Sequence, residues 1–429
     1  MPSRQKSIWI STLRSALRRV ISGSGALCVF FSVLLLPFLV RAEKRTLHLD
    51  LDADRNAALT STLSIERGIR TTLSEVDNRL GGLPAKIMTL DHHGSTPQSK
   101  RHLEQYPRDD RALALFSRLH SPPLLAHRDF INQKRILVLD AWAAAGPITR
   151  SSSAENWIFR LSVDDTKAGA AVLNHAFAEL SARTQHLLLE QTGWGRSNEE
   201  AIQSALALRG HAAAGVNWFN WGLQQGATRI LLRQIRATEA DVILLVANAA
   251  EGRSLIGAMN SLQEDQRLPV VNHWGITGGM SSDAIARDLS EGFHLCFIQT
   301  RFSFLDRARD PFGRAVFERT RQLFPETIKT PSDMKAPTGF IHAYDLTRIL
   351  IAAISQAKLT GEIEKDRVRV HTALEDLKLP VRGLIKSDRR PFRAFNQAHP
   401  DAHEALGGDD LTFARFAKDG SVKLDQGES

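Results

Sequence analysis

Short apolar runs alternate along the chain with segments whose apolar residues recur at helical spacing. Residues 46–51 show the period-two pattern of a strand, and residues 64–80 show the spacing of a helix that stops at Gly81-Gly82. The same rhythm predicts strands at 86–90, 112–116, 135–139, 186–190, 242–246 and 269–271, and helices from Ser121 and at 165–180, 198–208, 227–237 and 252–262. Strands and helices that alternate with short connections predict parallel sheets covered by helices on both faces, an α/β fold.

The chain length of 429 residues is more than one ordinary hydrophobic core organises, so we expect two lobes. The serine run at 151–153 is too short to tether two halves loosely. We therefore expect the chain to pass between the lobes through short structured segments. Near the C-terminus, residues 411–416 alternate like an edge strand, and Asp419-Gly420 marks a turn after it.

The first 42 residues have the three parts of an export signal. A basic segment without acidic residues runs to Arg19, an apolar stretch covers residues 26–40, and Val40-Arg41-Ala42 is typical of a cleavage site. We expect cleavage after Ala42, with an uncleaved membrane anchor as the alternative. Either outcome leaves the rest of the chain outside the cytoplasm, because the basic flank stays inside. The sequence therefore predicts a periplasmic protein.

Most of the positive charge belongs to this leader. The net charge is +8, and the leader holds six Lys and Arg residues and no acid, so the chain after Ala42 carries +2. A nucleic-acid-binding domain keeps a clustered basic patch, and the sequence after Ala42 has none, so we expect no nucleic-acid partner. Cleavage also leaves Cys296 as the one cysteine, which excludes an internal disulfide.

Common catalytic motifs are missing from the sequence: it has no nucleophile elbow after a strand, no phosphate loop, no dinucleotide fingerprint and no zinc-protease motif. An enzyme using His342 and Asp345 on one helix face is the alternative, but nothing supplies a nucleophile. His92 and His93 are adjacent and point to opposite faces, and His399 to His403 is predicted to be a surface loop. We therefore predict no enzyme activity, no metal site and no cofactor.

Three tryptophans occupy equivalent places in the predicted topology. Trp142, Trp194 and Trp274 each follow a predicted strand, at the sheet edge where ligands bind in doubly wound folds. This repetition predicts a shared aromatic pocket, and the alternative is that each ring packs beneath its own loop. Ser121, before Pro122-Pro123, is either a helix cap or a hydroxyl for a ligand oxygen.

Several motifs carry a resemblance to a known family. They are Gly68-Ile69 to Asn78 with Gly81-Gly82, Ser121-Pro122, Asn156 to Arg160 with Asp164-Asp165, Gly193 to Asn198, Ala240 to Leu245, and Gly339 to Asp345. By their order and spacing, the chain from Leu47 to Leu424 resembles the type I periplasmic binding proteins, specifically the branched-chain amino acid (Leu/Ile/Val-type) substrate-binding components of ABC transporters.

The resemblance implies two doubly wound parallel-sheet lobes joined by three crossings, near residues 160–164, 300–301 and 380–383. Lobe 1 then comprises residues 43–160 and 301–379, and lobe 2 comprises residues 161–300 and 380–429. By the same resemblance, the ligand-binding residues are Ser121, Trp142, Ala144, Trp194, Asn248, Glu251 and Trp274.

The chain departs from the amino-acid-binding pattern at three of these positions. Trp194 stands where relatives have Tyr, Ala144 where they have Thr, and Trp274 where they place an acidic residue for the ligand ammonium. Burying an ammonium without an anionic partner is unfavourable. A neutral or aromatic small molecule, or an amide, therefore fits these residues better than an amino acid. The alternative is that Glu251 supplies the anionic partner, unless it caps the helix that begins there.

The resulting interpretation is a periplasmic solute-binding component of an ABC transporter that captures a small molecule between its lobes by hinge closure. We expect a monomer that delivers its ligand to a membrane permease. The alternative is a ligand sensor of the same fold that signals to a membrane kinase or cyclase.

Overall fold

The computed structural model describes residues 46–117, 120–279, 282–289 and 294–425, so the predicted signal peptide lies outside the described residues. Contacts divide the chain into Met1–Thr46 and Leu47–Ser429, and every described helix and strand belongs to the second unit. Among the described residues, none of the helices combines the length and apolar composition that crossing a bilayer needs.

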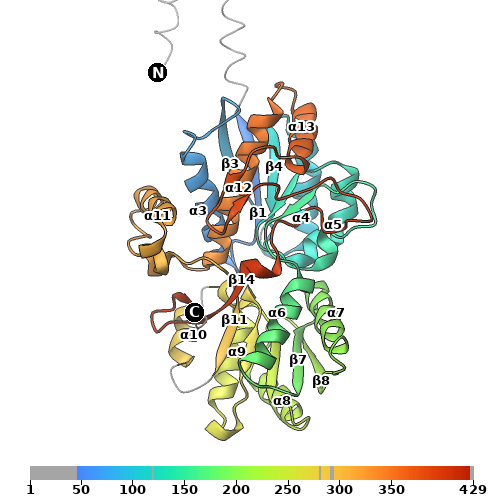
Figure 1. The fold of residues 1–429 in the computed structure, drawn as a ribbon, viewed down its shortest axis with the longest axis vertical. Helices are drawn as coiled ribbons and strands as arrows, with labels where there is room; N and C mark the ends of the chain where they lie inside the picture. The colour runs from blue at the N-terminus through green and yellow to red at the C-terminus, as the bar shows by residue number, and fades with distance from the viewer. Residues whose placement is uncertain (1–45, 118–119, 280–281, 290–293, 426–429) are drawn as a thin grey trace, which may run out of the picture. The chain divides into compact units, whose positions relative to one another are not determined.

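The first sheet of this unit has six strands in the order β2-β3-β1-β4-β5-β6. Strands β1, β3 and β4 of this sheet are labelled in Figure 1. Its strands are β1 (Leu47–Ala53), β2 (Arg79–Leu80), β3 (Leu83–Asp91), β4 (Ala112–Ser117), β5 (Val138–Asp140) and β6 (Ile158–Arg160). All are parallel except β2, which pairs antiparallel with β3. Every residue of β1 is buried, as expected of a central parallel strand with both faces covered.

Helices from two distant parts of the chain cover the first sheet. They are α3 (Leu59–Ser74), α4 (Thr96–Gln105), α5 (Ser121–Gln133), α12 (Pro337–Ala357) and α13 (Ile363–Glu375). Helices α3 and α12 approach closely at Gly68, where a Cβ would come within 2.5 Å of the Phe340 carbonyl oxygen. The bare Gly68 backbone therefore lets the late helix α12 join the early part of the chain in one core.

The second sheet has seven strands in the order β15-β14-β11-β10-β9-β7-β8. Its strands are β7 (Gln185–Glu190), β8 (Gly215–Phe219), β9 (Val242–Val246), β10 (Val270–Asn272), β11 (Leu295–Thr300), β14 (Leu411–Phe416) and β15 (Val422–Leu424). The intervening helices are α6 (Asp165–Ala178), α7 (Gly193–Ala207), α8 (Gln225–Arg236), α9 (Ala249–Asn260) and α10 (Ser282–Asp288). The first five strands along the chain are parallel, and β14 and β15 add antiparallel. The predicted α/β class with two parallel-sheet lobes is confirmed.

The remaining elements are α11 (Pro311–Leu323) and the hairpin β12 (Val381–Arg382) and β13 (Ser387–Asp388). After the hairpin the chain runs along the first sheet, where Arg160 N–H donates to the His403 oxygen at 2.9 Å and Ala405 N–H donates to the Arg160 oxygen at 3.0 Å. Arg301 N–H then donates to the Asp410 oxygen at 2.9 Å, beside the start of β14. The lobe boundaries stay a prediction, but these bonds argue for moving the last crossing from 380–383 to about 407–411.

Several local predictions were wrong. The helix predicted at 64–80 ends at Ser74, and Arg79–Leu80 forms strand β2. Helix α7 begins at Gly193 and not at Asn198, because the Thr192 side chain accepts from the Gly195 N–H and caps the helix earlier. Strand β14 is not an edge strand, since it pairs with β11 on one side and with β15 on the other.

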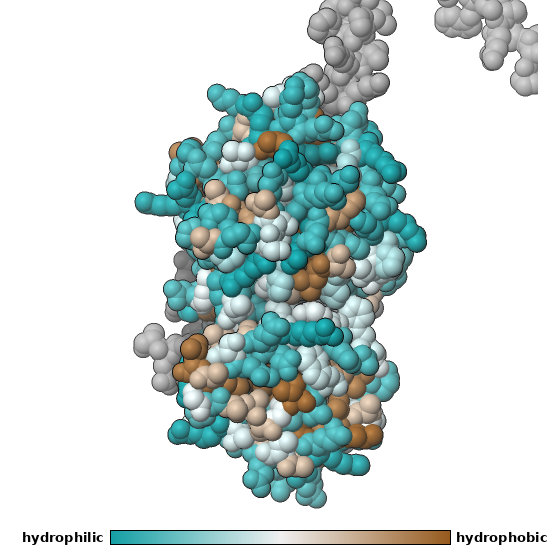
Figure 2. Space-filling model, turned by 90° about the vertical axis from the view of Figure 1, so that its right-hand side faces the viewer, coloured by the Kyte–Doolittle hydropathy of each residue, from teal (hydrophilic) through white to brown (hydrophobic). Residues whose placement is uncertain are grey.

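On the face shown in Figure 2, apolar residues lie in separate small groups among hydrophilic ones.

Candidate ligand site

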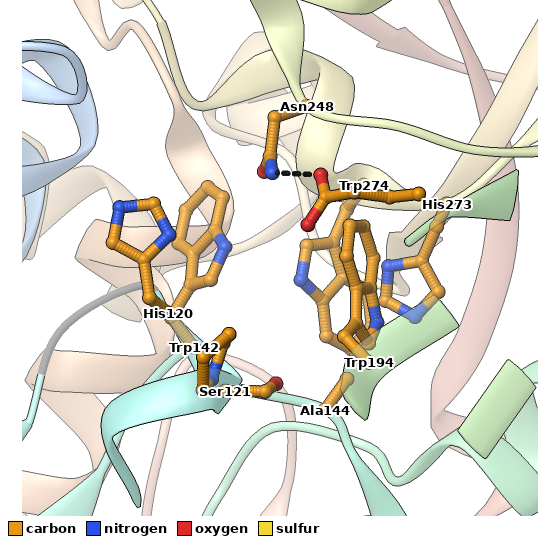
Figure 3. Close-up of a pocket in the computed structure, with 10 residues that line it drawn as sticks. His120, Ser121, Trp142, Ala144, Trp194, Asn248, His273 and Trp274 are labelled. Carbon is orange, nitrogen blue, oxygen red and sulfur yellow. Dashed lines mark hydrogen bonds between the residues drawn. The ribbon is translucent and has the colours of Figure 1, made fainter. Parts of the chain in front are cut away.

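The carboxyl ends of strands from both sheets bring most of the predicted residues together. A small inner cavity is lined by Ser121 at the start of α5, Trp142 and Ala144 after β5, Trp194 in α7, Asn248 after β9, and Trp274 after β10. Its other lining residues are His120, Pro122, Glu190 and His273 (Figure 3). Glu251, the seventh predicted residue, lines the larger cavity next to it. All seven residues therefore face two adjoining cavities, and their role in ligand binding stays a prediction.

The inner cavity is almost filled by its own aromatic rings. Trp142, Trp194 and Trp274 are 3%, 7% and 1% exposed, and the cavity volume is about 10 Å³, the space of one water molecule. The rings of Trp194, His273 and Trp274 lie together in Figure 3. His273 contacts Trp194 and Trp274 edge-on, with centroid distances of 5.1 and 4.3 Å. In this state the three predicted tryptophans pack mainly against protein.

Polar side chains contact two rings of the aromatic cluster and hold them in place. Trp194 Nε1 donates to Asp165 Oδ1 at 3.2 Å, and Trp274 contacts the ring of His342 at 5.8 Å. His342 lies between the Ala141 oxygen, 3.0 Å from Nδ1, and the Thr300 hydroxyl, 2.7 Å from Nε2. Burial lowers the pKa of His342 to about 4, so the imidazole is neutral at physiological pH.

The second residue of the proposed enzyme alternative also has structural partners. Asp345 accepts from the backbone N–H groups of Leu384 and Ile385 at 2.6 and 3.1 Å. Burial raises the pKa of Asp345 to about 7. Asp345 therefore anchors the chain near β12, and the pair offers no geometry for nucleophilic chemistry.

The larger, outer cavity has a volume of about 380 Å³, within the range of small-molecule sites. From the first lobe come Asp54, Ala57, Ala58, His93, Gly94 and His120, and from the second come Trp221, Gly222, Asn248, Ala249, Ala250, Glu251, Gly275, Gly278 and Gly279. His120 and Asn248 line both cavities. The outer cavity is therefore an opening between the two sheets that extends from the packed tryptophans.

A half-exposed ring lies on the wall of the outer cavity. Trp221 is 46% exposed, and its ring lies 5.4 Å from that of His120, which comes from the other lobe. His120 Nε2 is also 3.4 Å from Asp54 Oδ2. Trp221 was not predicted because the preceding strand β8 was not predicted, and His120 was not predicted because the expected ligand-binding residue was Ser121 beside it.

A buried carboxylate is part of the lining of the inner cavity. Glu190, the last residue of β7, is 1% exposed and accepts from Asn248 Nδ2 at 2.7 Å (Figure 3, dashed line) and from the Thr192 hydroxyl at 3.1 Å. Burial raises the pKa of Glu190 to about 7. The Asn248 side chain bonds to Glu190 and does not cap α9, whose first residues Ala249, Ala250 and Glu251 line the outer cavity. Sequence reasoning missed Glu190, whose one signal was a carboxylate at the end of an apolar strand.

An ion-pair cluster surrounds the predicted first crossing. Glu404 lies 3.0 Å from both the buried Arg160 and Arg150, and 2.6 Å from Lys167. Asp164 adds contacts of 3.0 Å to Arg150 and 2.9 Å to Lys167. Burial alone would raise the pKa of Glu404, but the charge of Arg160 and the surrounding hydrogen bonds hold it well below its usual range. The cluster ties the C-terminal segment to the start of α6.

The sequence profile of the periplasmic binding protein family matches residues 56–416, most of the chain. The chain belongs to the periplasmic binding protein family. The predicted family is thereby confirmed. No curated protein matches the chain in sequence.

Solved periplasmic binding proteins share the fold. A type 1 periplasmic binding protein from Bordetella pertussis Tohama I aligns with a TM-score of 0.71 at 14% identity, over 89% of this chain and 99% of that one. A solute-binding protein from R. palustris in complex with benzoate gives 0.69 at 14% identity, over 88% and 95%. An amino acid ABC transporter substrate-binding protein from Pseudomonas fluorescens Pf-5 gives 0.69 at 16% identity, over 90% and 96%. The last two are named as binding proteins of ABC transporters, one in complex with benzoate and one of an amino acid transporter, so these neighbours leave the ligand class of this chain open.

Proposed function

We propose that the protein captures a small organic molecule in the outer cavity and delivers it to the membrane permease of an ABC transporter. The observation that carries this proposal is a cavity of about 380 Å³ lined by both lobes. A ligand that contacts both lobes favours the closed arrangement over any open one, because the full contact set exists only when the lobes meet.

The lining of the cavity favours a neutral ligand that donates hydrogen bonds. Asp54 and Glu251 contribute carboxylates, and the described lining residues include neither Lys nor Arg. A free carboxylate such as benzoate would meet these two acids without a permanent cation, which costs desolvation energy. A ligand N–H group would instead find acceptors, since carboxylates are strong hydrogen-bond acceptors.

The start of α9 supplies the complementary donors. Its first N–H groups are not capped by the Asn248 side chain, and Ala249, Ala250 and Glu251 line the cavity. A carbonyl oxygen placed there would accept from these groups and interact favourably with the helix dipole. With Trp221 as an apolar wall, the site suits a small amide with an aromatic or aliphatic body.

A thermal-shift panel tests the ligand class. It compares aliphatic and aromatic amides with branched-chain amino acids and benzoate. We expect amides to stabilise the protein, by about 2.7 kcal/mol at a hundredfold excess over the dissociation constant. Stabilisation by amino acids or benzoate alone, or by no compound, would contradict the amide class.

An isosteric variant tests whether the ligand binds in the outer cavity. Glu251→Gln keeps an oxygen to accept from the Gly222 N–H, now 2.9 Å away, but removes the negative charge. We expect amide affinity to fall about 10- to 100-fold, as for a lost hydrogen bond to a charged group. Glu200→Gln, at an exposed position on α7, is the matched control and should bind normally. Equal affinity in both variants would place the ligand elsewhere.

A further inference from the structure

A second cluster of chemical interest lies away from the cavities, on the first lobe. His371 and Glu375 are one turn apart on α13, so they share a face of that helix. His403 joins them from the irregular segment that follows β13. One ligand-type atom from each residue lies within 4.8 Å of the others. Their side chains are 12%, 17% and 0% exposed, in that order.

Backbone carbonyls identify the protonated nitrogen of each imidazole. His371 Nε2 lies 2.8 Å from the Asn156 oxygen, and His403 Nδ1 lies 3.2 Å from the Ile158 oxygen. A carbonyl oxygen only accepts hydrogen bonds, so each of these nitrogens carries its hydrogen. This leaves His371 Nδ1 and His403 Nε2 as the lone-pair nitrogens of the neutral rings, and both face Glu375.

Neutral rings in this arrangement point lone pairs at a carboxylate. His403 Nε2 lies 3.1 Å from Glu375 Oε1, and His371 Nδ1 lies 3.7 Å from Glu375 Oε2. A positive species between the three groups would remove this conflict.

A single proton would satisfy only part of the cluster. It can bridge His403 and Glu375 at 3.1 Å, but the 3.7 Å separation at His371 is too long for a hydrogen bond. A metal ion, in contrast, engages all three donors at once. Two histidines and a carboxylate form a common zinc ligand set, and ligating histidines usually donate their other N–H to a carbonyl or carboxylate, as both rings do here.

We propose that His371, Glu375 and His403 bind one divalent metal ion of the zinc type. Aromatic rings enclose the site: Phe159 stacks on His403 at 3.9 Å, and Trp157 lies 4.2 Å from His371. This apolar shell limits the access of water and strengthens the electrostatic attraction for a cation.

The ion fastens the C-terminal segment to the first lobe. Between Glu375 and His403 the chain forms only the two-residue strands of the β12–β13 hairpin and one isolated bridge at Asn396 and His399. The next residue, Glu404, enters the ion-pair cluster at the first crossing. A metal at His403 therefore closes a long irregular loop and holds Glu404 in place.

The prediction of a surface loop at His399 to His403 is wrong for His403. His403 is fully buried, and the structure pairs it with His371, not with His399. The two ligands on α13 are far from His403 in sequence, so no local motif revealed the site.

Zinc titration of the purified, EDTA-treated protein tests the proposal. We expect one equivalent to bind and to raise the melting temperature. His371→Gln changes the most accessible histidine of the site and keeps its helical position. Losing a residue that only hydrogen-bonds to a metal ligand lowers metal affinity roughly 10- to 100-fold. Because His371 is proposed as a ligand itself, His371→Gln should lower zinc affinity by more than this. Failure of the wild-type protein to bind zinc would overturn the proposal.

Another group of possible metal ligands, separate from the proposed site, supplies the control that locates the ion. His175, His294 and Cys296 also lie close enough together to hold a metal. We expect Cys296→Ser to bind zinc like the wild type, and bound Co²⁺ to show no thiolate charge-transfer absorption. Loss of binding in Cys296→Ser with retention in His371→Gln, or a thiolate band with Co²⁺, would assign the ion to the cysteine cluster and refute the site on α13.

Discussion

The inner and outer cavities adjoin, share His120 and Asn248, and differ in what their tryptophans do. Around the inner cavity three tryptophans are buried in the protein, and the cavity between them has a volume of only about 10 Å³. On the wall of the outer cavity Trp221 is 46% exposed beside about 380 Å³ of open space. The difference teaches that position at a strand end does not decide whether an aromatic ring is scaffold or ligand surface. The packing behind the ring decides it.

The largest expected effect tests the scaffold role of the inner rings. Trp274→Ala removes a ring that is 1% exposed and packs against His273 and His342. We expect the free energy of unfolding to fall by about 3–5 kcal/mol, as for other buried large-to-small changes. Urea unfolding measures this change. A loss below about 1 kcal/mol would mean that the inner cluster is loosely packed and can open to a ligand.

The buried carboxylate of Glu190, which lines the inner cavity, gives the second effect. Burial raises the pKa of Glu190 to about 7 from 4.5, so the folded state keeps a proton that the unfolded state has released. Stability therefore falls as pH rises from about 4.5 to about 7 and is level above that range. Glu190→Gln removes this contribution, on the order of 2–3 kcal/mol.

Comparison of variants isolates this contribution from other groups. Asp50, Asp140, Asp345 and Asp388 also have raised pKa values and add to the same slope. We therefore expect Glu190→Gln to gain stability relative to the wild type between pH 5 and pH 8, measured by urea unfolding. Glu200→Gln at an exposed position should show no such gain. A difference between wild type and Glu190→Gln that does not change with pH would show that Glu190 is solvated.

The third effect probes the close contact at the boundary of the two cavities. A Cβ on Gly275 would come within 2.8 Å of the Trp194 ring and 2.9 Å of the Ala247 oxygen. Gly275→Ala should therefore destabilise the protein by about 1–3 kcal/mol, as overpacking does. Gly226→Ala in α8 meets nothing within 4 Å and should be neutral or slightly stabilising. Equal stability of the two variants would indicate that Trp194 moves easily.

The fold could be predicted because its evidence is local. A continuous apolar run such as β9 is typical of a parallel strand with both faces buried, and the order of such runs along the chain implies the layers. Strand β8 was missed because it lies at the sheet edge, where four of its five residues are only partly buried and the apolar signal is weak.

The outer cavity and the proposed metal site could not be predicted, because both are formed by contacts between residues that are distant in the sequence. His120 and Trp221 approach across the lobes, and His403 meets His371 through the path of an irregular segment. Such contacts leave no periodic signal in the sequence, because they depend on how separate elements pack. The tryptophans were found from their places after strands, but their burial depends on the neighbouring rings that fill the space.

The smallest effect on stability is the most informative for function. Trp221→Ala removes a half-exposed ring, so the free energy of unfolding should change by less than about 1 kcal/mol. Ligand affinity should fall about tenfold or more, because an aromatic side chain that contacts a bound molecule contributes much of its binding energy. Calorimetric titration with an amide from the panel and urea unfolding measure the two quantities on the same preparation. Leu208→Ala, at an 88% exposed position of the second lobe, is the control and should change neither. If Trp221→Ala keeps its affinity while Trp274→Ala, refolded and still native in circular dichroism, loses it, the roles of the two cavities are reversed and the tryptophan cluster opens to admit the ligand.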